Sequence, residues 1–277
     1  MLTEALRAEL IQIVRQAARV HILPRFRSLA AHEISTKSGP GDLVTLADTE
    51  AEAAMTAAIT ALMPDALVVG EEAIASVPAL RDRIGAAPLC VILDPVDGTW
   101  NFAKGLALFG VILAVTAHGR PVYGLLYDPL LDDWVEAASD LPTRMVSPAS
   151  TRNLATSDEG RIARLVGYVP VGLFPRDLRG QVLATFPPFS RVTSLRCACH
   201  EYRLLAQGHV EFALSGPTHN AWDHAAGVLA VQAAGGTARF LDGAAYDAGR
   251  ARGVLLATSS EAVWQEVAER FAFLKAI

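Results

Sequence analysis

The chain has 277 residues, of which 52% are hydrophobic, and a net charge of -5. This length allows one large α/β unit or two packed halves, and the apolar content excludes a disordered chain. No apolar run approaches the roughly 20 residues of a membrane helix, and the acidic balance without a basic stripe argues against a nucleic-acid polymer as partner. Three cysteines are too few for a disulfide scaffold, and the first ten residues include acids where a secretory signal would be apolar. We therefore expect a cytoplasmic protein with no membrane attachment.

Helical and strand patterns alternate through the first half. Pro24 and Pro64 mark the expected ends of two amphipathic helices, and the turn signal at His118–Pro121 predicts an antiparallel hairpin. The expected elements are a helix over 3–23, a loop over 37–42, a helix over 48–62, two buried strands over 66–70 and 89–93, and sheet strands over 110–117, 122–129 and 133–138.

The second half begins weakly near residue 140, where 141–153 reads as a connection. The expected elements are strands over 164–170 and 210–216, helices over 200–208 and 222–236, a turn at Asp242-Gly243, and a last helix after 251–260 that Ser259 or Ser260 caps. This alternation predicts an α/β (α+β) fold. We divide it into halves 1–140 and 141–277 that form one compact unit, with most candidate ligands in the first.

The strongest chemical signal follows the strand over 89–93. The sequence LCVILDPVDGTWNF places Asp94 and Asp97 on a stiff turn, because Pro95 fixes its own φ and restricts Asp94. Two carboxylates and the Val96 carbonyl offer hard oxygen ligands of the type that Mg²⁺ and Ca²⁺ prefer. An Asp-rich surface turn is the competing interpretation, with about even odds for this motif alone.

Three further acids stand at the ends of other predicted elements. Glu71 follows an apolar strand, and Asp48 and Asp223 begin predicted helices. Each has a structural alternative: Glu71 as surface charge, Asp48 and Asp223 as helix N-caps. Individually the structural alternatives are favoured, but jointly the acids indicate a metal site.

Four segments together resemble the inositol monophosphatase family. GDLVTLAD, VVGEE, LDPVDGTWNF and WDHAAG match the family signatures D-x-V-T-x-x-D, G-E-E, D-P-[IVL]-D-G-T-x-N-F and W-D-x-A-A, in the family's order, over about residues 37 to 236. The resemblance implies a layered α-β-α-β-α sandwich of the sugar-phosphatase type. It also implies a magnesium-dependent, lithium-sensitive phosphatase that acts on small phosphorylated metabolites and is commonly a homodimer.

The family pattern also implies roles at matching positions. Two or three Mg²⁺ ions would be held by Glu71, Asp94, the Val96 carbonyl, Asp97 and Asp223, with Asp94 bridging two of them. Thr99, hydrogen-bonded to Asp48, would orient and deprotonate the attacking water. Gly98, Thr99 and Lys37 would lie near the phosphate.

Departures from the family pattern concern the substrate. Members that act on inositol phosphates usually place a glutamate shortly before W-D, where this chain has Ser215 and Gly216. Arg196 either meets a second negative charge on the substrate or pairs with Glu201. Trp100, in a usually small position, is more simply a packing residue than a pocket wall.

Two further signals are weaker. His219, close to Asp223, is a candidate substrate contact, although isolated histidines are more often structural. The cluster Cys197, Cys199 and His200 invites a zinc interpretation, but three crowded donors without a fourth make a poor site.

Several functions therefore compete. The first prediction is a magnesium-dependent phosphatase for an inositol-phosphate-like monoester. Alternatives are a histidinol-phosphate phosphatase, a 3'(2'),5'-bisphosphate nucleotidase, and a catalytically silent regulatory or binding protein on the same fold. The aspartyl-phosphate phosphatases fit less well, because their two aspartates are separated by one residue rather than two.

Overall fold

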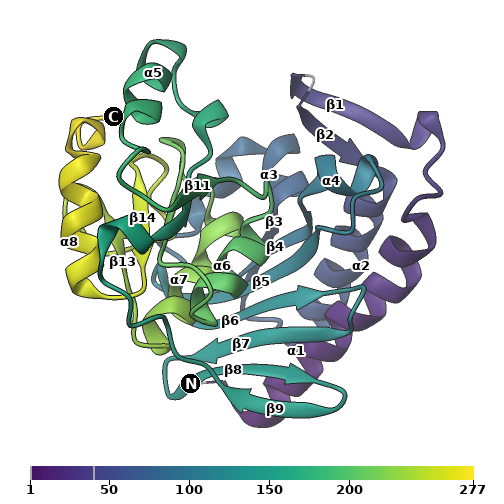
Figure 1. Cartoon of the computed structure of the whole chain (residues 1–277). Helices are drawn as coiled ribbons and strands as arrows, with labels where there is room; N and C mark the ends of the chain where they lie inside the picture. The colour runs from purple at the N-terminus through teal and green to yellow at the C-terminus, as the bar shows by residue number, and fades with distance from the viewer. Residues whose placement is uncertain (1, 40) are drawn as a thin grey trace.

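The computed structural model describes residues 2–39 and 41–277. Its largest element is a seven-stranded sheet in the order β3-β4-β5-β6-β7-β8-β9 (Figure 1), antiparallel except for the parallel pair β3 and β4. The strands are β3 (Leu67–Gly70), β4 (Cys90–Asp97), β5 (Gly110–Ala117), β6 (Arg120–Asp128), β7 (Asp133–Ala138), β8 (Leu141–Ser147) and β9 (Ser150–Asn153).

A second sheet is formed by the C-terminal part of the chain. Its five strands follow the order β11-β10-β12-β14-β13. They are β10 (Val166–Tyr168), β11 (Arg191–Thr193), β12 (Phe212–Leu214), β13 (Thr237–Phe240) and β14 (Leu255–Thr258). A separate hairpin pairs β1 (Ile34–Gly39) with β2 (Asp42–Thr45).

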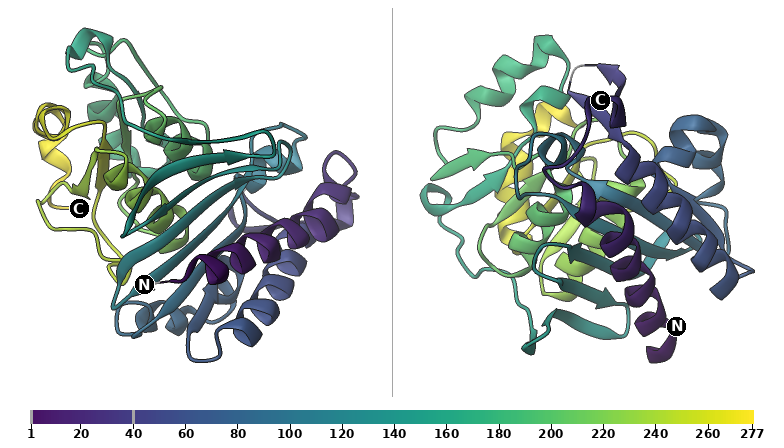
Figure 2. Two further views of the ribbon diagram at one scale, coloured as in Figure 1. Left: turned by 90° about the horizontal axis from the view of Figure 1, so that it is seen from below. Right: turned by 90° about the vertical axis from the view of Figure 1, so that its right-hand side faces the viewer.

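Helices lie on both sides of the large sheet (Figure 2). Helices α1 (Glu4–Ala17) and α2 (Leu46–Leu62) cover one face. Helices α6 (Ala198–Ala206) and α7 (Ala221–Ala233) fill the space between the two sheets, and α8 (Glu261–Arg270) packs on the outside of the second sheet. Three further α-helices lie in the described part of the chain: α3 (Glu71–Ser76), α4 (Thr99–Ala103) and α5 (Arg176–Ala184).

Three hydrophobic clusters fill the spaces between these layers. The first cluster packs α1 and α2 against the face of the large sheet on which Val91 and Leu93 of β4 lie. The second cluster packs α6 and α7 against the other face of this sheet, on which Ile92 lies. The third packs α8 against the second sheet through side chains such as Trp264. Because β4 is apolar on both faces, it is buried between helices on both sides. The predicted α-β-α-β-α layering is confirmed.

Most predicted elements are found within a few residues of their expected bounds. Ser260 caps α8, as its side chain accepts a hydrogen bond from the amide of Val263. The segment over 141–153 was wrongly assigned as a connection, since β8 and β9 extend the large sheet there. The predicted division at residue 140 therefore falls inside one sheet, and the second sheet begins only at Val166.

The predicted loop over 37–42 also needs correction. It is the turn region of the β1–β2 hairpin, whose register runs from Ile34↔Thr45 to Gly39↔Asp42; position 40 lies outside the described residues. Of the helices in the described part of the chain, none is long and apolar enough to cross a bilayer.

Candidate active site

A β-bulge in strand β4 brings the two aspartates of the central motif together. Asp94 pairs with Ile112 and Asp97 with Gly110, so two residues of β4 stand opposite one residue of β5. In a regular strand, residues three apart point to opposite faces, and one extra residue restores them to the same side. Pro95 is suited to this position because it has no amide hydrogen to offer the ladder. Asp94 and Asp97 are 2% and 7% exposed.

Gly98 makes the sharp turn from β4 into α4. Its φ of +85° is in the left-handed region, and a Cβ there would lie 3.0 Å from the carbonyl oxygen of Leu108. Only glycine meets both conditions without strain. The turn places Thr99 at the start of α4, facing the aspartates.

Thr99 and Asp48 form the hydrogen bond that the sequence analysis predicted. The Thr99 hydroxyl lies 3.0 Å from Asp48 Oδ1 and 3.0 Å from the Val96 carbonyl oxygen. Asp48 is not the N-cap of α2, because Thr45 takes that place. Instead, Asp48 Oδ2 accepts from the Thr45 amide (2.8 Å) and hydroxyl (2.6 Å), which fixes the carboxylate.

Glu71 begins α3, where β3 ends beside β4. Its carboxylate accepts from Lys37 Nζ at 2.7 Å, and Glu72 accepts from the same nitrogen at 2.5 Å. One ammonium cannot neutralise two carboxylates. Burial and repulsion by Glu71 therefore raise the pKa of Glu72 to about 7 despite the ion pair, while the pKa of Lys37 is raised by both carboxylates.

Glu52 was missed in the sequence analysis. It is 5% exposed, and its two oxygens accept from the amides of Glu72 and Ala73, each at 2.8 Å. It therefore holds the first turn of α3, and with it Glu71. The available signal was an acid four residues after Asp48, on the buried face of the predicted helix.

Asp223 lies in the first turn of α7, and its carboxylate is close to those of Asp94 and Asp97. Its Oδ2 accepts from the side-chain amide of Asn220 at 3.2 Å. Asn220 Oδ1 in turn accepts from Arg81 at 3.0 Å, and Arg81 also binds the carbonyl of His219. This support from Arg81 and Asn220 was also missed, because no local pattern links residues so distant in sequence.

Carboxylate oxygens of Asp94, Asp97 and Asp223 all lie within 4.8 Å of one another. Burial, followed by repulsion from Glu71, Asp97 and Asp223, raises the pKa of Asp94 well above its ordinary value. The pKa of Asp223 is raised in the same way, and that of Asp97 to about 6. Such a group of hard oxygen donors fits a divalent cation, which would remove the repulsion.

These side chains line one small hollow of about 160 Å³. The residues that line it are Gly41, Asp42, Leu43, Glu71, Asp94, Asp97, Gly98, Thr99, Trp100, Arg196 and Asp223. The acids from four separate segments and the Thr99–Asp48 pair thus meet at one opening, beside the β1–β2 hairpin.

The inositol monophosphatase family model matches residues 3–273. The chain belongs to this family. A relative named Nus factor SuhB, from Salmonella typhimurium, is 30% identical over 255 residues, which cover 85% of this chain and 83% of that one. An inositol-1-monophosphatase of Synechocystis is 28% identical over 249 residues, 87% of this chain and 80% of that one. A solved IMPase from Thermotoga maritima superposes with a TM-score of 0.80 at 22% identity and covers 98% of each chain.

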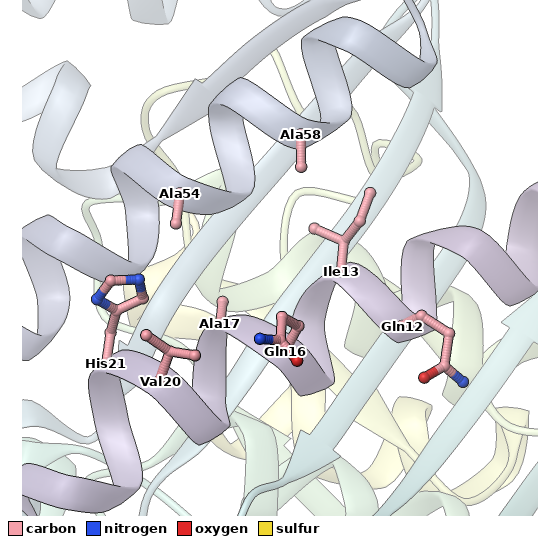
Figure 3. A pocket seen from close by; sticks show the side chains of 8 residues that line it. All are labelled: Gln12, Ile13, Gln16, Ala17, Val20, His21, Ala54 and Ala58. Atoms are coloured by element: carbon pink, nitrogen blue, oxygen red, sulfur yellow. The ribbon is translucent and has the colours of Figure 1, made fainter.

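Membership confirms the predicted family and, at the level of the family, the class of phosphoric monoester hydrolases. The acidic hollow is the candidate active site, and a groove elsewhere on the molecule differs from it in composition. That groove, about 420 Å³, lies between α1 and α2 (Figure 3), and the eight residues that line it include no carboxylate.

His219 was wrongly predicted to contact the substrate. Its ring is 1% exposed and is enclosed by His224, Phe240 and Tyr246, with ring centroids 4.9–5.2 Å away. The aromatic cluster removes it from the hollow, so this family member uses His219 for packing.

The segment Cys197–His200 is a support for Asp97. Cys197 Sγ lies 3.1 Å from Asp97 Oδ2, and the amide of Cys199 donates to the same oxygen. His200 Nε2 instead lies 3.0 Å from the carbonyl oxygen of Phe109. Among the described residues, the metal-type cluster found is the aspartate group, so the zinc interpretation has no support.

The acids of this family member should make the metal-free protein less stable as pH rises. Burial raises the pKa of Asp48 to about 6 and that of Glu201 to about 7. Both groups hold protons more tightly in the folded chain than in the unfolded chain, so their contribution to stability is present at low pH and is lost between about pH 4 and pH 7. With cations chelated, the free energy of unfolding should be lower at pH 8 than at pH 5, by up to about 3 kcal/mol per group.

Urea unfolding followed by circular dichroism at the two pH values measures this difference. Glu201→Gln should reduce it, whereas Glu9→Gln, an exposed control in α1, should leave it unchanged. Equal stability at pH 5 and pH 8 would contradict the assigned pKa directions.

Proposed function

We propose that this chain is a magnesium-dependent phosphatase that hydrolyses a phosphate monoester of a small metabolite with an activated water molecule. The observation that supports this most is the meeting of Asp94, Asp97 and Asp223 within 4.8 Å, at a hollow that also contains Glu71 and Thr99. Two bound Mg²⁺ ions would neutralise the developing charge on the phosphate and favour a hydroxide-like nucleophile.

In this proposal the ligands are shared between two ions. Asp94 would contribute to both sets, Glu71 and the Val96 carbonyl would complete one, and Asp97 and Asp223 would complete the other. The Val96 carbonyl oxygen lies 3.0 Å from the Thr99 hydroxyl, whose single hydrogen goes to Asp48 in this proposal, so the carbonyl lone pairs are available to a cation. Lys37, which is paired with Glu71, lies beside this set and would be close to a third ion bound there.

Thr99 and Asp48 would orient and deprotonate the attacking water. The Thr99 hydroxyl donates to Asp48 and can accept a proton from water, and a carboxylate of pKa about 6 is suited to take up a proton near neutral pH. The water oxygen bonds to phosphorus, the ester P–O bond breaks, and the leaving alcohol oxygen takes a proton from solvent. Gly98 allows the phosphate to approach the backbone closely at the start of α4.

Release of inorganic phosphate tests this function. Inositol 1-phosphate, histidinol phosphate and adenosine 3',5'-bisphosphate should be compared with and without Mg²⁺, and with EDTA. Turnover that needs Mg²⁺ supports the proposal. Complete inactivity with Mg²⁺ on a broad panel of phosphomonoesters would favour the silent regulatory alternative, to which the name of the Nus factor relative adds weight.

Asn220 should influence metal affinity through Asp223. Asn220→Ala removes the hydrogen bond that holds Asp223 Oδ2, and loss of such support typically costs about 10- to 100-fold in metal affinity or activity. The Mg²⁺ concentration for half-maximal activity should rise accordingly. Asn153→Ala, on the exposed strand β9, serves as the control and should not change it; an unchanged requirement in Asn220→Ala would contradict the role.

The expected homodimer and the cytoplasmic location remain predictions. Light scattering during size-exclusion chromatography would test the first, since a mass near 29.4 kDa would indicate a monomer.

A further inference from the structure

Arg196, in the segment before α6, lines the same hollow as Asp94 and Asp223. Its guanidinium carbon lies 4.3 Å from the centre of the Trp100 ring, and Nη2 donates to the carbonyl oxygen of Gly41 at 3.2 Å. Arg196 therefore contacts both Trp100 in α4 and the turn of the β1–β2 hairpin. Trp100 is a pocket wall here, and the two contacts fix the direction of the guanidinium.

The backbone at Arg196 has a conformation that glycine would adopt more easily. Its φ is +54°, in the left-handed region, which costs a residue with a side chain about 1 kcal/mol. The amide of Arg196 donates to Ser194 Oγ, and Glu201 accepts from the Leu195 amide and from Ser194 Oγ, which locks the turn. The turn therefore presents the arginine side chain at the opening despite this strain.

The two contacts that hold Arg196 do not neutralise its charge. Both contacts described above are with groups that carry no net charge, and the Glu201 carboxylate, the ion-pair partner considered from the sequence, binds backbone and hydroxyl groups instead. Lys37, a second cation near Glu71, is already shared by Glu71 and Glu72. The guanidinium can therefore bind an anionic group that the phosphate site itself does not use.

In the described structure, the segment over 211–221 contributes no carboxylate to the lining of the hollow for binding sugar hydroxyls. Ser215 is 5% exposed, and its hydroxyl binds the Gly216 carbonyl and the Leu255 amide. Glu211 accepts from the Val166 amide at 2.7 Å, within the second sheet. Neither residue is placed to hold a neutral polyol.

We propose that the substrate is a phosphate monoester with a second anionic group, a carboxylate or another phosphate, and that Arg196 on Trp100 binds this group. The inference rests on the proposed phosphatase function. It ranks bisphosphates and phosphorylated acids above inositol phosphate, whose polyol is neutral, and above histidinol phosphate, whose amine is cationic.

A matched pair of substrates isolates the second charge. Glycerol 3-phosphate and 3-phosphoglycerate share a three-carbon chain and one phosphate, and differ by a carboxylate in place of a hydroxymethyl group. The wild-type enzyme with Mg²⁺ should prefer 3-phosphoglycerate in kcat/KM, mainly through KM. Arg196→Gln should reduce this preference by about 10- to 100-fold, as expected when a charged hydrogen bond is lost.

Three further variants separate charge from structure. Arg196→Gly removes the charge and suits the left-handed backbone, so it should fold at least as well and lose the same preference. Arg196→Lys should restore part of the preference, since it keeps the charge but stacks less well on Trp100. Arg176→Gln, exposed on α5, makes the same change in net charge and should leave the preference intact.

The outcomes distinguish the two proposals. If neither substrate nor the broader panel is hydrolysed, the phosphatase proposal is wrong. If substrates are hydrolysed but wild type and Arg196→Gly show the same ratio for the matched pair, the second-anion inference is wrong. Equilibrium binding of 3-phosphoglycerate to the slow Thr99→Ala variant with Mg²⁺, with and without Arg196→Gly, gives a second readout, and equal affinities would overturn the inference.

Discussion

Replacing Asp94 with Asn should abolish phosphatase turnover, with a loss in kcat/KM of about 10³-fold or more. Asp94 is 2% exposed, and its carboxylate is surrounded by Glu71, Asp97 and Asp223. It is the group proposed to contact both cations. Asn keeps the shape and one oxygen but loses the negative charge, so the cation pair loses its shared ligand.

The same substitution should not unfold the protein. Because the carboxylates repel one another when no cation is present, removing one charge should leave the melting temperature of the chelated protein unchanged or higher. Asp65→Asn, at the exposed start of the segment leading to β3, is the control and should keep full activity. Activity of Asp94→Asn within tenfold of wild type, in a folded sample, would show that Asp94 is not a shared ligand.

Replacing Thr99 with Ala should lower kcat by about 10²- to 10⁴-fold while changing the Mg²⁺ requirement little. The hydroxyl connects the proposed water to Asp48 through the 3.0 Å hydrogen bond, whereas the metal ligands are carboxylates and a carbonyl. Removing the hydroxyl therefore removes the orienting and proton-accepting group, and leaves the ligand set intact.

Thr99→Ser is the matched control, because it retains the hydroxyl and should keep most of the activity. Steady-state rates measured across a Mg²⁺ titration separate kcat from metal affinity. Parallel losses of turnover and of Mg²⁺ affinity in Thr99→Ala would contradict a role in water activation and would indicate a structural role at the start of α4.

The sequence predicted the acidic group because its members belong to short, ordered motifs. Pro95 and Gly98 restrict the backbone locally, so the turn that joins Asp94 to Thr99 could be inferred without a structure. The meeting of Glu71 and Asp223 with this turn came from the family pattern rather than from local rules. The structure shows that they meet, although their roles as ligands remain predictions.

The sequence did not predict features that depend on distant contacts. Residues 141–153 contain Pro142 and many polar side chains, so they resembled a loop, yet β8 is secured by partners such as Ala230, whose carbonyl accepts from Thr143 at 2.6 Å. Helix α5 was missed since Gly180 interrupts its pattern. His219 was misassigned because closeness in sequence to Asp223 does not reveal that its ring packs among aromatic side chains.

The extra residue of β4 limits how the central motif can vary. With one residue fewer between Asp94 and Asp97, β4 would pair regularly with β5 and the two aspartates would still share a face, but the bend that the bulge makes before Gly98 and Thr99 would be lost; with one residue more, Asp97 would point away from Asp94. Val96 contributes its side chain only to the core beneath α1 and α2, so other aliphatic residues can replace it. Among related chains that keep the activity, we therefore expect the spacing of the two aspartates to be invariant while the identity of the residue at position 96 drifts.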